Sequence, residues 1–487
     1  MSAKVIMIQG TTSDAGKSIA VTALCRWLKR KGYKVAPFKP QNMALNSAVT
    51  DDGGEIGRAQ ALQALACELP LSVHFNPVLL KPSSDQSSQV IIHGKAVDQL
   101  TAKKFGNIKK LAFNKVLESF QYLKEHFDYI VVEGAGSPAE INLRENDIAN
   151  MGFAEEIDCS VVLISDIDRG GVFAHIVGTL QLLSESERNR IKGFIINKFR
   201  GSIELLQSGI DWLEKYCQRP VYGTIPFIQQ LKLDAEDAIN IEQSNDSAPI
   251  KIKIPVFSRI SNHTDFDALR WHPKVDVQFI GQNDSLKGAD LIILPGSKNV
   301  RADLNMLLNS SWLADIKQHL RYGGKLMGIC GGFQMLGNKI DDPLGIEDLA
   351  GSTSGLGLLD FITELEPQKK LTQVSGHFSS LPSAPVSGYE IHCGISQGPA
   401  LKKPLIKYCL HDQEYTDGAI SGCGSIIGTY LHGIFDSKEA CTTILNWVEP
   451  TLVESIDFNQ VRISEIDRLT DHFAHYCDFE KLIDSAV

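Results

Sequence analysis

The chain has 487 residues, of which 48 are Lys or Arg and 58 are Asp or Glu, so its formal net charge is −10. A hydrophobic fraction of 43% and a charged fraction of 22% are those of an ordinary globular protein and exclude a disordered or fibrous chain. The acidic balance argues against nucleic acid or an anionic membrane as the main partner, because both attract basic surfaces. The length corresponds to about three average domains, or two large ones.

We find no signal-peptide core and no apolar run long enough to cross a membrane, and we therefore expect a cytoplasmic protein. The ten cysteines are scattered and include no Cys-x-x-Cys pair. This spacing predicts neither a disulfide framework nor a zinc site, so most of the thiols are expected to be reduced and buried.

The first half of the chain alternates short β-branched runs with longer amphipathic stretches. Strands that alternate with helices of this length predict βαβ units and a parallel sheet covered on both faces. The expected strands are Lys4–Gln9, Lys34–Phe38, Tyr129–Val132, Ser160–Ser165, Gly193–Asn197 and Val221–Ile225, and the expected helices are Lys17–Lys31, Gly57–Glu68, Lys104–His126, Gly171–Leu183 and Ile203–Tyr216.

A polar, breaker-rich stretch separates this half from a second series of strand-like runs. These runs are Ile252–Phe257, Val277–Ile280, Leu291–Leu294 and Lys325–Ile329, and short alternating runs that follow, from about residue 345 to 429, predict added antiparallel strands. We therefore predict an α/β fold in two domains. Residues 1–241 form a phosphate-loop parallel sheet with helices on both faces, 242–250 a linker, 251–445 a second α/β domain, and 446–487 a helical tail.

The first predicted strand runs into Gly10-Thr-Thr-Ser-Asp-Ala-Gly-Lys-Ser18, a G-x-x-x-x-G-K-[ST] loop with one extra residue. Its glycines let backbone N–H groups curl around an anion, and the next helix presents its positive N-terminal end. Lys17 would reach the outer phosphates and the Ser18 hydroxyl would bind Mg²⁺. The nucleotide site is expected to contain Gly10, Thr12, Ser13, Asp14, Ala15, Gly16, Lys17 and Ser18.

Further strand ends supply candidates for the metal and the base. Mg²⁺ prefers hard oxygen ligands, and Glu133 ends an apolar strand, where ligand groups collect in open parallel sheets. Asp52, or its neighbour Asp51, is a candidate for another ligand, although turn formation explains the pair equally well. Asn197 lies where phosphate-loop proteins bind the base. Arg200 replaces the Asp that would bind guanine, which favours ATP over GTP.

A strand in the second half ends at Gly328-Ile-Cys-Gly-Gly332, before a predicted helix. Such a string is typical of a nucleophile elbow, in which small neighbours permit a strained turn and the helix N-terminus favours a thiolate. Gly331, together with Gly296 in the loop Leu294-Pro-Gly-Ser-Lys298, is a candidate oxyanion donor. A cysteine nucleophile also needs a proton acceptor, and His432 follows an apolar run late in the chain. These features predict acyl transfer by the Cys330 thiolate.

The elbow, the Pro-Gly-Ser loop and the late histidine resemble a class I glutamine amidotransferase domain. The resemblance implies that Cys330 attacks the side-chain amide of glutamine, that His432 is the general base, and that Gly296 and Gly331 belong to the oxyanion loops. Ammonia is released and water cleaves the thioester. That family has a Glu two residues after the histidine, whereas this chain has Ile434, so we expect a Cys–His dyad.

The lengthened phosphate loop with Glu133-Gly-Ala-Gly136 is similar to that of dethiobiotin synthetase, an enzyme that activates a carboxylate by phosphorylation. Joined to a glutaminase, such an ATPase predicts ATP-dependent amidation of a carboxylic acid. Longer strings resemble the cobyric acid synthase family over nearly the whole chain. They are Lys39-Pro-Gln-Asn-Met-Ala-Leu-Asn46, Glu133-Gly-Ala-Gly-Ser-Pro-Ala-Glu-Ile-Asn-Leu143, Ser165-Asp-Ile-Asp-Arg-Gly-Gly-Val-Phe173, Asn197-Lys-Phe-Arg-Gly201 and Pro295-Gly-Ser-Lys-Asn299.

This resemblance implies amidation of the b, d, e and g carboxylates of adenosylcobyrinic acid a,c-diamide, a corrinoid, to give adenosylcobyric acid in cobalamin biosynthesis. ATP and glutamine would be co-substrates, Mg²⁺ the cofactor and acyl phosphates the intermediates. A polycarboxylate needs cations, and the matching strings and their surroundings carry Lys39, Arg58, Arg144 and Arg169. We expect Lys39 and Arg169 to bind the substrate.

Two alternatives remain open at this point. The related a,c-diamide synthase performs the same chemistry at two other carboxylates. A partition-type ATPase would use the phosphate loop as a binding switch but would leave Cys330 and His432 without a role.

Overall fold

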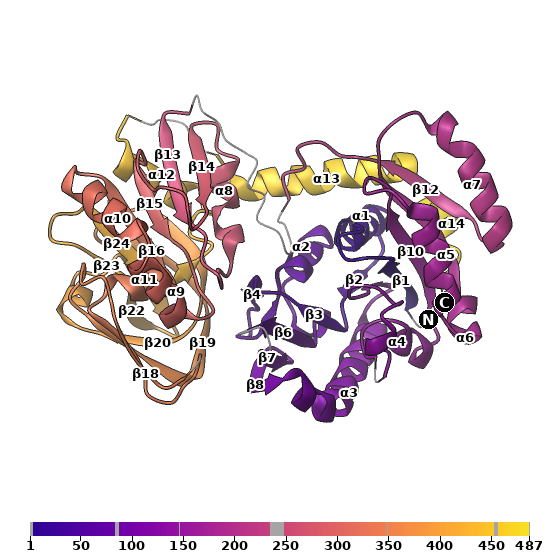
Figure 1. Cartoon of the computed structure of the whole chain (residues 1–487), viewed down its shortest axis with the longest axis horizontal. Coiled ribbons are helices and arrows are strands. Elements are labelled where there is room, and N and C mark those ends of the chain that lie inside the picture. Colours follow the sequence, from indigo (N-terminus) through magenta and orange to yellow (C-terminus); the bar gives the residue numbers. More distant parts are fainter. Residues whose placement is uncertain are drawn as a thin grey trace. The chain divides into compact units, whose positions relative to one another are not determined.

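The computed structural model describes residues 3–82, 87–145, 147–233, 248–347, 349–451 and 456–486. Its contacts divide the chain into two compact units (Figure 1). The first contains Met1–Ala44, Gly54–Glu236 and Val461–Val487, and the second contains Leu45–Gly53 and Asp237–Gln460. The predicted linker lies mostly outside the described residues. The division differs from the predicted one because Leu45–Gly53 joins the second unit and most of the predicted tail joins the first.

The first unit is built on a six-stranded sheet in which every paired neighbour is parallel. Its strands, in spatial order, are β12 (Val221–Pro226), β11 (Ile191–Phe199), β10 (Ser160–Asp166), β1 (Lys4–Gly10), β9 (Tyr129–Glu133) and β2 (Val35–Phe38). Because β1 pairs with β9 so that Ile8 faces Glu133, the loop after β1 begins beside that carboxylate. All six strands were expected from the sequence, and the predicted α/β class is confirmed.

The two faces of this sheet bury separate apolar cores, since successive side chains of a strand point to opposite sides. In β1, Val5 and Met7 contribute to one core and Ile6 and Ile8 to the other. The first core is covered by α3 (Ala102–His126), α4 (Met151–Glu156), α5 (Val172–Leu182) and α7 (Ile203–Cys217), with α6 (Glu185–Arg190) before β11. The second is covered by α1 (Lys17–Arg30), α13 (Phe458–Tyr476) and α14 (Phe479–Ile483), with residues of α2 (Arg58–Ala66).

Short strands between β2 and α3 were not predicted. A four-stranded sheet has the order β3 (Gln41–Met43), β6 (Val78–Pro82), β7 (Ser87–Ile92) and β8 (Lys95–Thr101), and the region also contains β4 (Ser47–Val49), β5 (Glu55–Gly57) and the 3₁₀ turn η1 (Val73–Phe75). Strands of three residues are too short to show an alternating pattern, which explains why the sequence did not reveal β3, β4 and β5.

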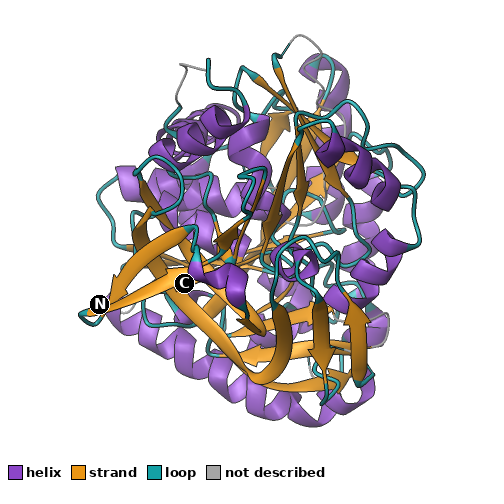
Figure 2. Ribbon diagram, turned by 90° about the vertical axis from the view of Figure 1, so that its left-hand side faces the viewer, coloured by secondary structure: helices purple, strands orange, loops and turns teal. Residues whose placement is uncertain are grey.

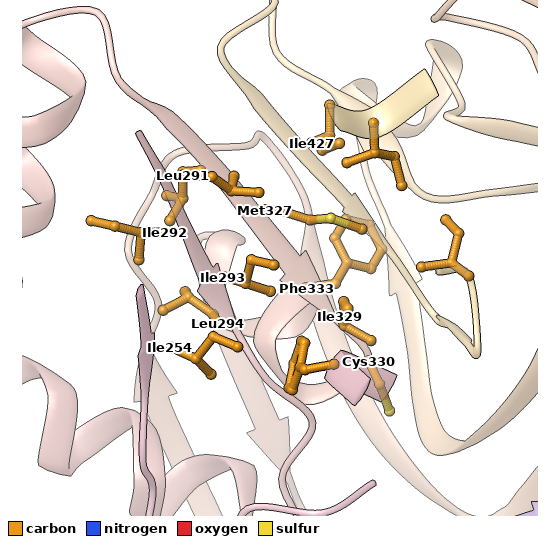
Figure 3. Packing of buried hydrophobic residues seen from close by; sticks show 14 of the residues in the cluster. Ile254, Leu291, Ile292, Ile293, Leu294, Met327, Ile329, Cys330, Phe333 and Ile427 are labelled. Carbon is orange, nitrogen blue, oxygen red and sulfur yellow. The ribbon is translucent and has the colours of Figure 1, made fainter. Parts of the chain in front are cut away.

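The second unit also contains a mainly parallel sheet flanked by helices (Figure 2). The strand order is β14 (Val275–Ile280), β13 (Ile250–Pro255), β15 (Leu291–Leu294), β16 (Lys325–Ile329), β24 (Ile426–Thr429) and β23 (Ala419–Ile420), and only the last pair is antiparallel. The helices are α8 (Asp267–Arg270), α9 (Val300–Leu308), α10 (Trp312–Arg321), α11 (Gly331–Leu336) and α12 (Lys438–Val448). Isoleucines and leucines of the central strands fill its core (Figure 3).

A seven-stranded, largely antiparallel sheet completes this unit, as the alternating runs predicted. Its path is β18 (Gly351–Ser354), β17 (Lys339–Asp342), β19 (Ile362–Phe378), β20 (Pro385–Gln397) and β25 (Leu431–His432). Off this path, β21 (Ile406–Leu410) pairs with β19, and β22 (Gln413–Asp417) pairs with β21. The pairing of β20 with β25 sets Tyr389 opposite His432. Within the described part of the chain, no helix has the length and apolar character needed to cross a bilayer.

Candidate active sites

The phosphate loop connects β1 to α1, as predicted. Gly16 has a φ of 103°, and a Cβ at this position would collide with the Asn197 amide, so only glycine fits. Asn197 Nδ2 donates to the Ala15 carbonyl at 2.9 Å. Lys17 Nζ donates to the Thr12 carbonyl at 3.1 Å, which holds the ammonium group inside the loop. Asn197 therefore supports the loop backbone, and its contact with a nucleotide base stays a prediction.

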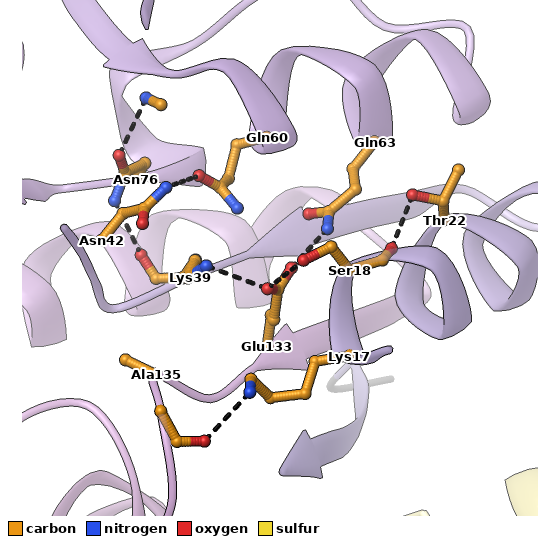
Figure 4. Close-up of polar contacts among 12 residues, drawn as sticks. Lys17, Ser18, Thr22, Lys39, Asn42, Gln60, Gln63, Asn76, Glu133 and Ala135 are labelled. Atoms are coloured by element: carbon orange, nitrogen blue, oxygen red, sulfur yellow. Dashed lines mark hydrogen bonds and ion pairs between the residues drawn. The ribbon is translucent and has the colours of Figure 1, made fainter. Parts of the chain in front are cut away.

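Glu133, at the end of β9, is fully buried, and polar side chains converge on its carboxylate (Figure 4). Its Oε1 accepts hydrogen bonds from Ser18 Oγ at 2.8 Å and from Lys39 Nζ at 2.9 Å. Its Oε2 accepts from Gln63 Nε2 at 2.5 Å. A buried charge needs such partners, because it has lost its hydration. The structure thus brings together Ser18, Glu133 and Lys39, which the sequence analysis had assigned to the same reaction.

Ser18 and Glu133 fit a Mg²⁺ ion, which is usually held by one or two carboxylates together with nucleotide phosphates. Their oxygens lie 2.8 Å apart, close enough to share one ion. Asp52, the other candidate ligand, belongs to the second unit, where its carboxylate accepts a hydrogen bond from the Thr50 hydroxyl. This contact fits the turn explanation, and a role of Asp52 at the metal stays a prediction. The described residues contain no cluster of three or more His, Cys, Asp or Glu suited to a metal.

The predicted substrate cations have different surroundings. Lys39 is buried and paired with Glu133, whereas the Arg169 side chain is 71% exposed and lies 3.6 Å from a carboxylate oxygen of Asp14 in the phosphate loop. Arg144 donates to the Leu182 carbonyl at 2.8 Å and pairs with Glu187. These contacts give Arg144 a structural role, whereas Arg169 lies beside the phosphate loop with its side chain open to solvent.

Cys330 stands between β16 and α11 with φ 50° and ψ −108°, a conformation that residues other than glycine rarely adopt. A Cβ at Gly328 would lie 2.6 Å from the Gly332 carbonyl oxygen, and one at Gly332 would collide with the Leu294 carbonyl. Both neighbours must therefore be glycine, as an elbow requires. Figure 3 shows the Cys330 sulfur beyond the end of the packed strand.

His432, at the end of β25, is paired with a carboxylate that the sequence analysis missed. Its Nδ1 lies 2.6 Å from Oδ2 of Asp265, and Asp265 Oδ1 accepts from the Gly433 N–H at 2.9 Å. Asp265 lies in the 3₁₀ turn η3 (His263–Phe266), whereas Ile434 is a buried apolar residue. The expected dyad is therefore wrong, because the site contains a third, acidic member. In the sequence, the signal for Asp265 is limited to the polar run 261–265 after a strand, and no motif spacing connects that run with His432.

The electrostatics of this group favour an ion pair. Burial lowers the pKa of His432, but the Asp265 carboxylate and the Cys330 thiol raise it to about 10. His432 is consequently cationic at neutral pH, with the Asp265 carboxylate and the Cys330 side chain as its partners. The Tyr389 ring stacks on the imidazole, with centroids 5.5 Å apart and planes inclined by 23°. The Ile391 carbonyl lies 3.7 Å from the Cys330 sulfur.

The two predicted oxyanion loops meet at this group. A Cβ at Gly331 would lie 2.9 Å from the Ser297 backbone nitrogen, and one at Gly296 would lie 3.1 Å from Cε1 of His432. The Gly296 carbonyl accepts from the Ser261 N–H at 3.0 Å, which ties its loop to the segment before Asp265. The structure thus assembles the elbow, the second glycine loop and the histidine from three distant parts of the sequence.

A pocket of about 230 Å³ opens along β20 next to the residue whose carbonyl faces the thiol. It is lined by Glu366, Gln368, Lys369, Lys370, His392, Cys393, Gly394 and Ile395. Gln334, one turn after Cys330, donates from Nε2 to the Tyr430 hydroxyl at 3.3 Å, while its buried Oε1 has no hydrogen-bond partner among the described residues. The side-chain amide of Gln334 also approaches Gly394 in the pocket wall. Polar groups of both signs therefore line this small cavity.

Two protein-family models match the two halves of the chain. Residues 6–241 match the CobQ/CobB/MinD/ParA nucleotide binding domain, and residues 251–440 match the CobB/CobQ-like glutamine amidotransferase domain. The chain joins these two domains. This combination fits the CobQ/CobB family and accounts for both the phosphate loop and the cysteine elbow.

Several solved structures align with parts of the chain at low similarity. PurLQS from Thermotoga maritima is 18% identical with a TM-score of 0.32, over 41% of this chain and 99% of its own. A glutamine amidotransferase is 13% identical with a TM-score of 0.32, over 40% and 97%. Chloroplast FtsY from Physcomitrella patens is 17% identical with a TM-score of 0.27, over 46% and 58%. Each likeness covers less than half of the amidotransferase chain described here.

Proposed function

We propose that the protein uses ATP and glutamine to amidate a carboxylic acid. The observation that carries the proposal is the presence, in one chain, of a phosphate loop with Ser18 and Glu133 and of a Cys330–His432–Asp265 group. One site activates a carboxylate and the other supplies ammonia. Carboxylate activation alone would leave Cys330 without a role, and glutamine hydrolysis alone would leave the phosphate loop without one.

Glutamine hydrolysis is assigned to the second unit. The Cys330 thiolate attacks the amide carbon of glutamine, and the carbonyl electrons move to an oxyanion stabilised by the loops of Gly296 and Gly331. His432 gives its proton to the departing amide nitrogen, so ammonia leaves and a thioester remains. His432 then takes a proton from water, whose oxygen attacks the thioester and displaces the thiolate, giving glutamate. Asp265 holds the imidazole and stabilises its cationic form.

Carboxylate activation is assigned to the first unit. A substrate carboxylate oxygen attacks the γ-phosphorus of ATP, ADP leaves, and the acyl phosphate is then attacked by ammonia, which displaces phosphate and forms the amide. Backbone N–H groups of the phosphate loop and Lys17 would hold the phosphates. Ser18 and Glu133 would hold Mg²⁺, which when bound neutralises phosphate charge. Asn197 keeps the loop in shape through the Ala15 carbonyl.

The finer proposal is that the substrate is adenosylcobyrinic acid a,c-diamide, amidated at its b, d, e and g carboxylates to adenosylcobyric acid. It is supported by the long strings that resemble the cobyric acid synthase family and by the match of both halves to CobQ/CobB-type models. Lys39 and Arg169 are the proposed cations for this polyanion, Lys39 at Glu133 and Arg169 beside the phosphate loop.

One assay tests the reaction and its substrate together. The enzyme is incubated with MgATP, glutamine and the a,c-diamide, and the products are analysed by mass spectrometry. Four successive exchanges of a hydroxyl for an amino group are expected. Failure to modify the a,c-diamide, with two additions to the unamidated corrinoid acid instead, would replace this assignment with the a,c-diamide synthase reaction.

A further inference from the structure

The segment Leu45–Gly53 is packed within the second unit, although the chain on both sides of it belongs to the first. Asn46 Nδ2 lies 2.9 Å from Nε2 of His263, and its Oδ1 accepts from the His263 backbone N–H at 3.2 Å. The Ser47 N–H donates to Oδ1 of Asn262 at 2.9 Å. These two partners begin the η3 turn, so the segment holds the turn that carries Asp265.

The same segment also contacts β20, the strand that pairs with β25 at His432. The Tyr389 hydroxyl donates to the Ser47 carbonyl at 2.9 Å, while the Tyr389 ring stacks on His432. Val49 is fully buried and packs with Tyr389 and Ile391, the residue whose carbonyl faces the catalytic sulfur. Residues 45–53 therefore contact neighbours of Cys330, of His432 and of Asp265, but they contribute no catalytic atom themselves.

Both ends of the segment are fixed in the first unit. The Ala44 N–H donates to the Leu80 carbonyl at 3.1 Å, and the Glu55 N–H donates to the Gly94 carbonyl at 3.0 Å. Residues 45–53 are therefore held at both ends, which restricts the positions that Asn46 and Ser47 can take.

We propose that residues 45–53 position the His432–Asp265 pair for glutamine hydrolysis. Because a misplacement of about 1 Å in a catalytic group can lower a rate on the order of 100-fold, loss of the contacts of Asn46 or Ser47 is sufficient to slow this step. Asn46, Ser47 and Tyr389 are positioning residues. The inference rests on the proposed function, since it requires glutamine hydrolysis at Cys330.

The test uses the full chain with Asn46→Ala, the more conservative Asn46→Asp, and Asn305→Ala as a control. Asn305 is an exposed asparagine in α9 of the second unit. Glutamate release is measured in the presence of MgATP and the a,c-diamide, and synthesis is measured separately with ammonium chloride. We expect Asn46→Ala to lower the kcat of hydrolysis by about 10- to 100-fold with little change in KM, since Asn46 contacts the turn that carries Asp265.

Asn46→Asp keeps the acceptor for the His263 N–H and should recover part of this rate, whereas Asn305→Ala should behave as the parent enzyme. Ammonia-dependent synthesis should be retained by all three variants. A normal kcat in Asn46→Ala would overturn the inference, as would an equal loss of ammonia-dependent synthesis. If the parent enzyme hydrolyses no glutamine, the proposed function itself fails.

Discussion

The pairing of His432 with Asp265 makes a quantitative prediction for Asp265→Asn. The amide has nearly the same size as the carboxylate but carries no charge, so it removes one of the two groups that raise the pKa of His432 to about 10 from an ordinary 6.5. The Asp265 carboxylate and the Cys330 thiol share that rise. We therefore expect the pKa of His432 to fall by about two units in the variant.

This change has a direct kinetic consequence. A cationic His432 is needed to give its proton to the departing amide nitrogen, so activity is lost as the pH rises through the pKa of His432. The alkaline limb of kcat/KM for glutamine hydrolysis should move from near pH 10 to about pH 8. The maximal rate should also fall about 10²- to 10⁴-fold, because the imidazole loses the partner that fixes its tautomer.

The assay follows glutamate release by the parent enzyme and two variants across this pH range. Asp267→Asn is the matched control, because Asp267 lies two residues away but has Arg270, at 3.1 Å, as its ionic partner. Synthesis from ammonia reports whether the variants are folded. An alkaline limb that stays in place in Asp265→Asn, or one that moves equally in Asp267→Asn, would refute the role of Asp265.

Three further predictions concern other residues of the second unit. Cys330→Ala should abolish glutamine-dependent synthesis and retain synthesis from ammonia, measured side by side as ADP release, because the thiolate serves only to liberate ammonia; loss of both would contradict the division of labour. Gly296→Ala would place a Cβ 3.1 Å from Cε1 of His432, so it should lower glutamine hydrolysis at least tenfold and leave ammonia-dependent synthesis unchanged. Burial raises the pKa of Asp417 to about 7 from 3.8. The protonated carboxyl therefore stabilises the fold fully below pH 3.8, and this stabilisation is lost as the pH rises through 7. Asp417→Asn should accordingly reduce the decline in the free energy of unfolding over that interval, as urea titrations would show; an unchanged pH dependence would exclude an ionising Asp417.

The sequence predicted the parts of each site that are continuous in the chain. A phosphate loop after β1 and an elbow around Cys330 are local arrangements, because the strand, the glycine turn and the helix follow one another directly. The buried strands of both parallel sheets were predictable for the same reason, since their apolar runs have the right length. These features depend on neighbouring residues and on backbone geometry, which sequence patterns record.

Contacts between distant segments were not predictable in this way. Asp265 and His432 are 167 positions apart in the sequence, yet their side chains are in contact. The Glu that usually fills this role is recognised by its position two residues after the histidine. Residues 45–53 look like an ordinary polar loop, yet Asn46 and Val49 are buried in the second unit. Periodicity gave no reason to place them there, because their burial depends on η3 and β20, which come much later in the chain.

The two sites also explain why a net charge of −10 is compatible with an anionic co-substrate. At the phosphate site, Lys17 and Lys39 are both buried, and Glu133 accepts a hydrogen bond from Lys39 without neutralising Lys17. At the thiol, the buried Asp265 carboxylate and Cys330 together keep His432 cationic. In each case the local charge is set by two or three desolvated groups, whose interactions are strong because water is excluded. The surface charge of the whole chain affects long-range attraction, whereas these buried groups determine which anion each site can hold.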